Sequence, residues 1–94
     1  MITFLVERTI PARLHPDDPA DVALHCRWAA DAYKKVGAFW LGGVVTEDRM
    51  YSLVTVEQEE DLRRYCKSLG IPDSDVVFRR VLHPLGPFLA QPKS

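Results

Sequence analysis

The chain has 94 residues, 47% of them apolar, and a formal charge of −1 at pH 7. This length supports one domain with one core. Acidic and basic residues are interspersed, without a lysine- and arginine-rich run that would neutralise phosphates, so we expect no nucleic acid partner. No apolar stretch approaches the roughly 20 residues that cross a bilayer, and the N-terminus does not read as a cleavable signal. We therefore expect a cytoplasmic protein without a membrane partner.

The size of the chain also argues for self-association. A domain this short buries only about 60–65% of the surface that its unfolded chain exposes. Covering a remaining apolar face with a second copy adds stability to the folded state. We expect a homodimer or a larger homo-oligomer.

The first predicted strand covers residues 2–8. Within it, Ile2, Phe4 and Val6 alternate with a second set of side chains that includes Glu7. This period of two is typical of a strand whose two faces meet different environments. We place the first set in the core and predict that Glu7 points away from the helix-covered side of the sheet.

A predicted helix follows a loop over residues 9–18, which contains two prolines. Asp18 is of a preferred N-cap type, Pro19 suits the first turn, and Gly37 ends the helix. One apolar stripe runs along it, made of Val22, Cys26, Ala29, Tyr33 and Val36. We expect this stripe to cover the sheet.

Residues 39–56 predict a β-hairpin with Glu47, Asp48 and Arg49 in its turn, because the flanking segments are rich in β-branched and aromatic residues. Gly42-Gly43 lies inside the first of these strands. Glycine there marks a bulge or a place where another group approaches the backbone closely. The space beside these glycines suits a ligand.

The acidic residues in 57–61 favour the first turn of a second helix, where the helix dipole stabilises negative charge. Gly70-Ile71-Pro72 stops this helix. A fourth strand is predicted over residues 76–82. We assign residues 1–83 to one domain and residues 84–94 to a proline-rich C-terminal tail.

The predicted element order is β-α-β-β-α-β. Because crossover connections are right-handed, both helices then lie on one face of a four-stranded antiparallel sheet. This is the α+β, ferredoxin-like fold. No helix covers the other sheet face, so we predict that it pairs with a second copy, lines a pocket for an apolar ligand, or does both.

Glu7 is the acid most suggestive of chemistry, because we predict it on a central strand facing the helix-free side. An apolar pocket favours the protonated form of a carboxyl group, which makes it a usable proton donor or acceptor near neutral pH. The alternative is an ion pair with Arg79 or Arg80 of the fourth strand. Since successive strand residues point to opposite faces, only one of these arginines can serve the helix-free side.

Aromatic residues and glycines of the predicted sheet supply candidate ligand contacts. Trp40, Tyr51 and Phe78 can wall one cavity, with the Tyr51 hydroxyl group as a directional hydrogen-bonding group. Gly42 and Gly43 leave room beside them. The alternative is that these aromatic side chains are ordinary core residues.

We hypothesise that the helix-free face binds a small apolar or aromatic metabolite. A cofactor-free isomerase or cyclase could then use Glu7 as acid and base, with Tyr51 and Arg79 polarising the substrate. No phosphate loop, dinucleotide fingerprint or nucleophile motif is present, so no cofactor is expected.

Several segments resemble a family of small ferredoxin-like proteins, best known through a nickel-binding bacterial member and otherwise of unknown function. They are Val6-Glu7-Arg8-Thr9 followed by Pro11, Trp40 before the hairpin, Thr46 to Tyr51, Glu59 to Arg64, and Leu69-Gly70-Ile71-Pro72. The likeness spans nearly the whole chain. It implies a homo-oligomeric ferredoxin-like protein and, for some members, nickel binding.

The chain departs from the family pattern at polar positions. Relatives usually have Ser-Tyr at Gly43-Val44, and often Cys at Ser52 and His at Tyr65. Three potential ligand groups are thus missing, which weakens the inference of metal binding. A nickel or other transition-metal protein without catalysis is therefore the second hypothesis, with His25 as its candidate ligand; a half-buried histidine without a metal is the alternative.

Overall fold

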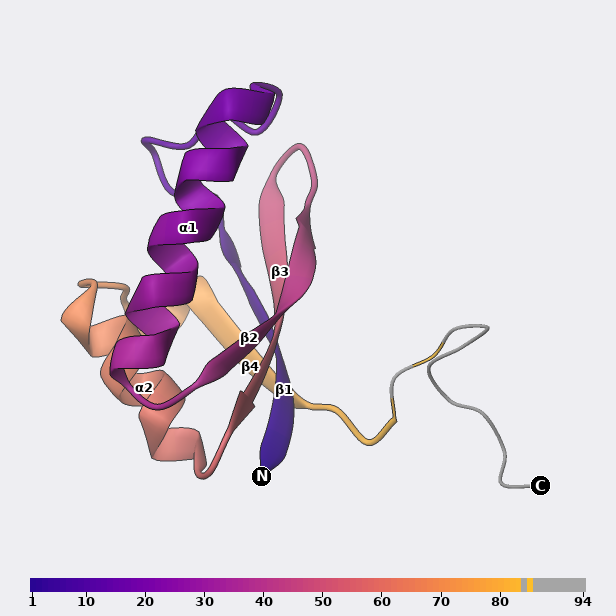
Figure 1. Cartoon of the computed structure of the whole chain (residues 1–94), viewed down its shortest axis with the longest axis vertical. Helices are drawn as coiled ribbons and strands as arrows, with labels where there is room; N and C mark the ends of the chain where they lie inside the picture. The colour runs from indigo at the N-terminus through magenta and orange to yellow at the C-terminus, as the bar shows by residue number, and fades with distance from the viewer. Residues whose placement is uncertain (84, 86–94) are drawn as a thin grey trace.

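The protein is described by a computed structural model, which places residues 1–83 and 85. A four-stranded antiparallel sheet has the strand order β2-β3-β1-β4, with two helices (Figure 1). The elements are β1 (Ile2–Thr9), α1 (Pro19–Lys35), β2 (Phe39–Val45), β3 (Arg49–Val56), α2 (Glu59–Ser68), a short 3-10 helix (Asp73–Asp75) and β4 (Val76–Arg80). The predicted α+β, ferredoxin-like fold is confirmed. The predicted tail over 84–94 lies, apart from Leu85, outside the described residues.

The register of the strands sorts their side chains onto two faces. On β1, Phe4 lies opposite Val54 and belongs to the side that the helices cover. Glu7, three residues further along β1, lies opposite Tyr51 of β3 on one side and Val77 of β4 on the other. Directly opposed residues share a face, so these three lie on the other side of the sheet. In Figure 1 both helices lie on the same side of the strands.

The core lies between the helices and the sheet. Its buried members are Phe4, Val6, Tyr33, Ala38, Val54, Val56, Leu62, Tyr65 and Cys66. Each fully buried aliphatic side chain contributes about 1.5–3 kcal/mol relative to an exposed one. Tyr33 of α1 stacks on Tyr65 of α2, with ring centroids 3.9 Å apart and planes inclined by 3°. Burial raises the pKa of both phenols above the usual value, so both rings are packed in neutral form.

Neither described helix is long and apolar enough to span a bilayer.

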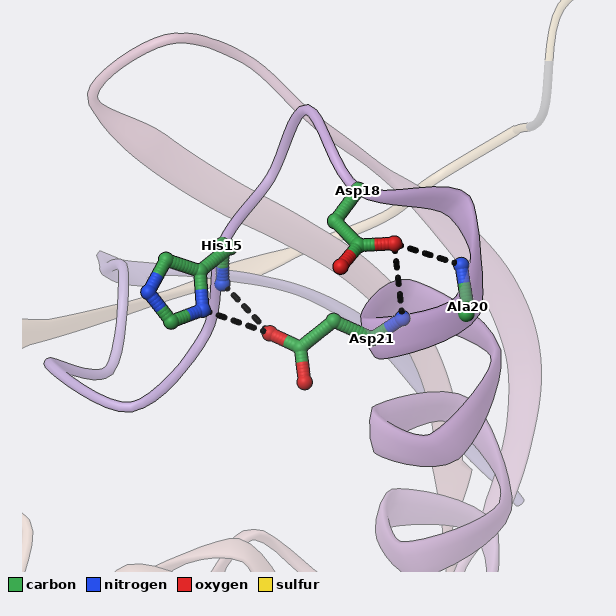
Figure 2. A network of polar contacts seen from close by, with 4 residues as sticks. All are labelled: His15, Asp18, Ala20 and Asp21. Carbon is green, nitrogen blue, oxygen red and sulfur yellow. Dashed lines mark hydrogen bonds and ion pairs between the residues drawn. The ribbon is translucent and has the colours of Figure 1, made fainter.

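Two aspartates fasten the start of α1 (Figure 2). The Asp18 carboxylate accepts hydrogen bonds from the backbone N–H groups of Ala20 and Asp21, at 3.0 and 3.5 Å, as predicted for an N-cap. The Asp21 carboxylate in turn accepts a hydrogen bond from the backbone N–H of His15 at 2.6 Å. The Nδ1 atom of the His15 ring lies 3.2 Å from the same carboxylate oxygen. The backbone hydrogen bond holds the pKa of Asp21 below its usual value. The loop over 10–18 is thereby tied to the helix.

The predicted bulge is present in β2. Pairing with β3 shifts between Trp40 and Gly42, which leaves Leu41 as the extra residue, and Gly42 has a φ of 127°. At Gly43, a Cβ atom would overlap the carbonyl oxygen of Tyr51. The group that approaches Gly43 closely is therefore the backbone of β3, its hairpin partner. The sequence had instead suggested a ligand in this space.

Several strand ends differ from the prediction; β1, for example, runs one residue further, to Thr9. β4 ends at Arg80, two residues before Leu82, although the N–H of Val81 still donates to the Thr3 carbonyl of β1 at 2.9 Å. Arg49 opens β3 and does not lie in the turn, since the N–H of Thr46 donates to the Arg49 carbonyl at 2.8 Å and closes the hairpin there. As a strand residue, Arg49 carries its side chain onto a sheet face.

Candidate functional site

The sheet face that the helices leave uncovered combines apolar side chains with a few polar ones. Phe39 and Val44 are exposed, at 64% and 63% of their full surface. By register this uncovered face carries Thr3, Leu5, Glu7, Thr9, Phe39, Val44, Arg49, Tyr51, Leu53, Thr55, Val77 and Arg79. At one end of the face, the hydroxyl groups of Thr3 and Thr55 lie 3.1 Å apart and hydrogen-bond to each other. The middle of the face is left largely apolar.

An ion pair lies at the other end of this face. Arg49 Nε is 3.1 Å from Glu7 Oε2, and the two side chains are 32% and 25% exposed. Nε itself is buried and makes no hydrogen bond to another described atom, so the contact is an electrostatic one between partly shielded charges. Neither predicted partner, Arg79 or Arg80, makes this pair. Arg80 lies opposite Phe4, on the helix side.

The three predicted catalytic residues share the uncovered face. Tyr51 lies directly opposite Glu7 on β3, and Arg79 lies opposite Leu5, one same-face position along β1 from Glu7. This proximity follows from the register of three adjacent strands. The cation in contact with the carboxylate is nevertheless Arg49, and Arg79 is an exposed residue that takes part in none of the ion pairs of the described part of the chain.

The predicted ligand-binding residues are divided between the two faces. Trp40 lies opposite Val54 and Phe78 opposite Val6, so both belong to the helix-covered side. Phe78 packs beneath the Arg63 guanidinium group, whose carbon lies 5.7 Å from the ring centroid. Trp40 and Tyr51 nevertheless both line one cavity, between α1 and the hairpin, whereas Phe78 does not line it.

Gly42 and Gly43 are divided in the same way. Gly42 lies opposite Leu53 on the uncovered face, whereas Gly43 lies opposite Ser52 on the helix side. Consecutive strand residues alternate between the faces, and the bulge at Leu41 decides which glycine lies on which face, because one extra residue inverts the alternation of the strand.

A cavity of about 120 Å³ lies between α1 and the hairpin. Its lining includes Leu14, Val22, His25, Cys26, Trp40 and Gly43, and it extends to Tyr51 at the hairpin. The indole Nε1 of Trp40 is buried and has no hydrogen-bond partner among the described residues. Burial lowers the pKa of His25, and the nearby positive charge of Arg8 lowers it further, which favours the neutral imidazole.

His25 and Cys26 both line this cavity, although they are neighbours on the helix. Over residues 1–83 and 85, no group of three or more His, Cys, Asp and Glu side chains is placed to hold a metal ion. Nickel binding, which the family resemblance implied, stays a prediction.

Arg49 is the site residue that the sequence missed. Its place in an acidic and polar stretch favoured the turn, and only the hydrogen bond between Thr46 and Arg49 fixes it as the first residue of β3. The spacing held a usable signal, since a shorter turn would have placed Arg49 on the same face as Tyr51.

No family model, no curated protein and no solved structure matches this chain.

Proposed function

We propose that this protein is a homodimer that pairs through the uncovered sheet face and binds a small apolar or aromatic metabolite there. The observation that supports this most directly is the Glu7–Arg49 ion pair on a face whose middle is largely apolar. A pair of partly shielded charges gives such a surface a fixed polar point that can orient a ligand.

The dimensions of the uncovered face suit a second copy. The longest strands have 8 residues, so four strands give a face of roughly 19 by 26 Å, or about 500 Å² in projection. The accessible area of a surface with protruding side chains exceeds its projection and approaches the roughly 800 Å² per partner of a standard interface. Phe39 and Val44, each more than 60% exposed, would become buried.

The polar groups give the face its specificity. Burying Glu7 and Arg49 in a dimer removes water from both charges, which is costly unless other polar atoms replace it. The Tyr51 hydroxyl group and a polar group of the ligand are suitable replacements. The proposal therefore includes a pocket around the ion pair, enclosed by the second copy.

Proton-transfer chemistry is an extension of this binding function. An isomerisation or cyclisation would use the Glu7 carboxylate to move a proton, with Tyr51 polarising the substrate. Arg49 holds the carboxylate and Arg79 faces the ligand, so the two arginines would have different roles.

Matched lysine substitutions test the dimer. Val44 and Leu24 are similarly exposed, at 63% and 60%, but Leu24 lies on α1. We expect Val44→Lys to raise the dimer dissociation constant at least 100-fold in sedimentation equilibrium, because it buries an unpaired charge, and Leu24→Lys to leave it unchanged. A wild-type chain that stays monomeric at about 100 μM would overturn the proposal.

Binding is tested with 2-naphthol, a small aromatic probe with one hydroxyl group. We expect amide shift changes at Leu5, Tyr51 and Leu53 in NMR titrations, and at least fivefold weaker binding for Tyr51→Phe. Shift changes confined to the helical side would contradict the assignment to the sheet face.

A further inference from the structure

A groove of about 380 Å³ opens on the helical side of the molecule, on the other side of the sheet from the uncovered face. Its lining is Arg8, Pro11, Arg13, His25, Trp28, Leu69 and Ile71. It thus lies where the end of β1 and the following loop meet α1 and the segment after α2. The loop is the one that the Asp21 hydrogen bonds tie down.

Arg8 is the unusual residue of this groove. It lies opposite Met50 and Val76, on the helix-covered face, and is only partly exposed. None of the ion pairs found in residues 1–83 and 85 includes it, and its Nε donates only to the backbone carbonyl of Thr9, at 3.3 Å. Removing a guanidinium group from water without pairing it to an anion is unfavourable. An anionic ligand bound beside Arg8 would offset this cost.

The other lining residues add positive charge and aromatic surface. Arg13 is a second cation, and none of the lining side chains is acidic. Asp31, an acid further along α1, lines an adjoining hollow instead. Trp28 is 49% exposed, and its ring centroid lies 5.8 Å from that of His25.

We propose that this groove binds a small planar aromatic carboxylate, with the carboxylate group on Arg8 and Arg13 and the ring against Trp28. The planar guanidinium fork matches a carboxylate with two parallel hydrogen bonds. The indole offers a face for stacking, and Leu69 and Ile71 supply apolar contacts. The volume falls within the range of small-molecule pockets, which is about 300–1,000 Å³. This site is separate from the proposed sheet-face site.

The test compares 2-naphthoate with its neutral analogue 2-naphthamide, by calorimetry and by NMR titration of the full chain. We expect 2-naphthoate to bind at least tenfold more tightly, with shift changes at the Trp28 indole N–H and the amides of Arg8 and Ile71. Equal affinities, or shift changes restricted to the uncovered face, would overturn the proposal.

Substitutions then separate the groove from general electrostatics. Arg8→Gln should weaken 2-naphthoate binding at least tenfold and Arg8→Lys by less, because lysine keeps the charge and loses the fork. Arg27→Gln removes a charge from an exposed position of α1 outside the groove and should leave affinity unchanged.

Two further variants keep the result interpretable. If Arg8→Gln fails to fold, Trp28→Leu provides the second test, with an expected loss of at least fivefold. Val44→Lys should retain groove binding, so failure of the proposed dimer and failure of this site give different results. Undiminished binding by both Arg8→Gln and Trp28→Leu would refute the groove.

Discussion

Arg49 Nε lies 3.1 Å from Glu7 Oε2, across β3 and β1, on the face that neither helix covers. Arg79 flanks the same carboxylate from β4 without making this contact. The two arginines are therefore a matched pair for measuring what proximity contributes at this position.

A double-mutant cycle measures the contribution of the pair. For Glu7→Gln and Arg49→Gln, we expect a coupling free energy of about 0.5–1 kcal/mol, because both side chains are still a quarter to a third exposed. The cycle of Glu7→Gln with Arg79→Gln should give about zero. Urea unfolding provides the free energies, and equal couplings in the two cycles would contradict the observed geometry.

Gly43→Ala should destabilise the protein by about 2–3 kcal/mol, because the new methyl group must displace the Tyr51 carbonyl, which is backbone and cannot rotate away. Gly70 is the control. It has a φ of 69° and no atom within 4 Å of a Cβ, so Gly70→Ala should cost only about 1 kcal/mol. Thermal and urea unfolding measure both changes, and an inverted ranking would count against the register of β2.

The stacked tyrosines predict a loss of stability at alkaline pH. Burial raises the pKa of Tyr33 and Tyr65 above the value of about 10 in the unfolded chain, so their contribution is complete below pH 10 and declines as the pH rises further. Tyr33→Phe keeps the stacked ring and removes one ionisable group. We expect its unfolding free energy to fall less steeply between pH 9.5 and about 11.5, on the scale of one group's titration. An unchanged slope would show that Tyr33 ionises without unfolding.

The start of α1 predicts a loss of stability in acid. The pKa of Asp21 is lowered, so its contribution is present above the unfolded value of about 3.9 and is lost as the pH falls through the lower folded value. Asp21→Asn should lower the melting temperature at pH 7, and the difference from wild type should shrink towards pH 3. Faster amide exchange at Leu14 should accompany it, since the same loop is released. Asp17→Asn, a charge change in that loop, should reproduce neither effect.

The element order and the facing of Glu7 could be predicted because both depend on local patterns. The alternation of β1 and the capping residues of α1 each determine a structure within a few residues. A bulge near Gly42-Gly43 could be predicted from glycine chemistry, but its place at Leu41 and its effect on facing could not. One inserted residue inverts the alternation, so the faces of Trp40 and Gly43 depend on where the bulge lies.

The partners of the charged side chains were beyond the sequence. Whether Glu7 meets Arg49 or Arg79 depends on the side-chain positions of two neighbouring strands, and both arginines lie one same-face position away. The isolation of Arg8 is a property of everything packed around it. Unpaired charge has no local signature, which is why the groove emerges only from the assembled fold.

Glu7 and Arg8 are consecutive residues whose side chains point to opposite sides of β1. If the strand slid by one position against its neighbours, the carboxylate would enter the space under the helices and the guanidinium would move to the outer surface. Both charges would then lose their surroundings at once. The pairing register of β1 is thus stabilised by these two opposite charges as well as by the apolar side chains beside them.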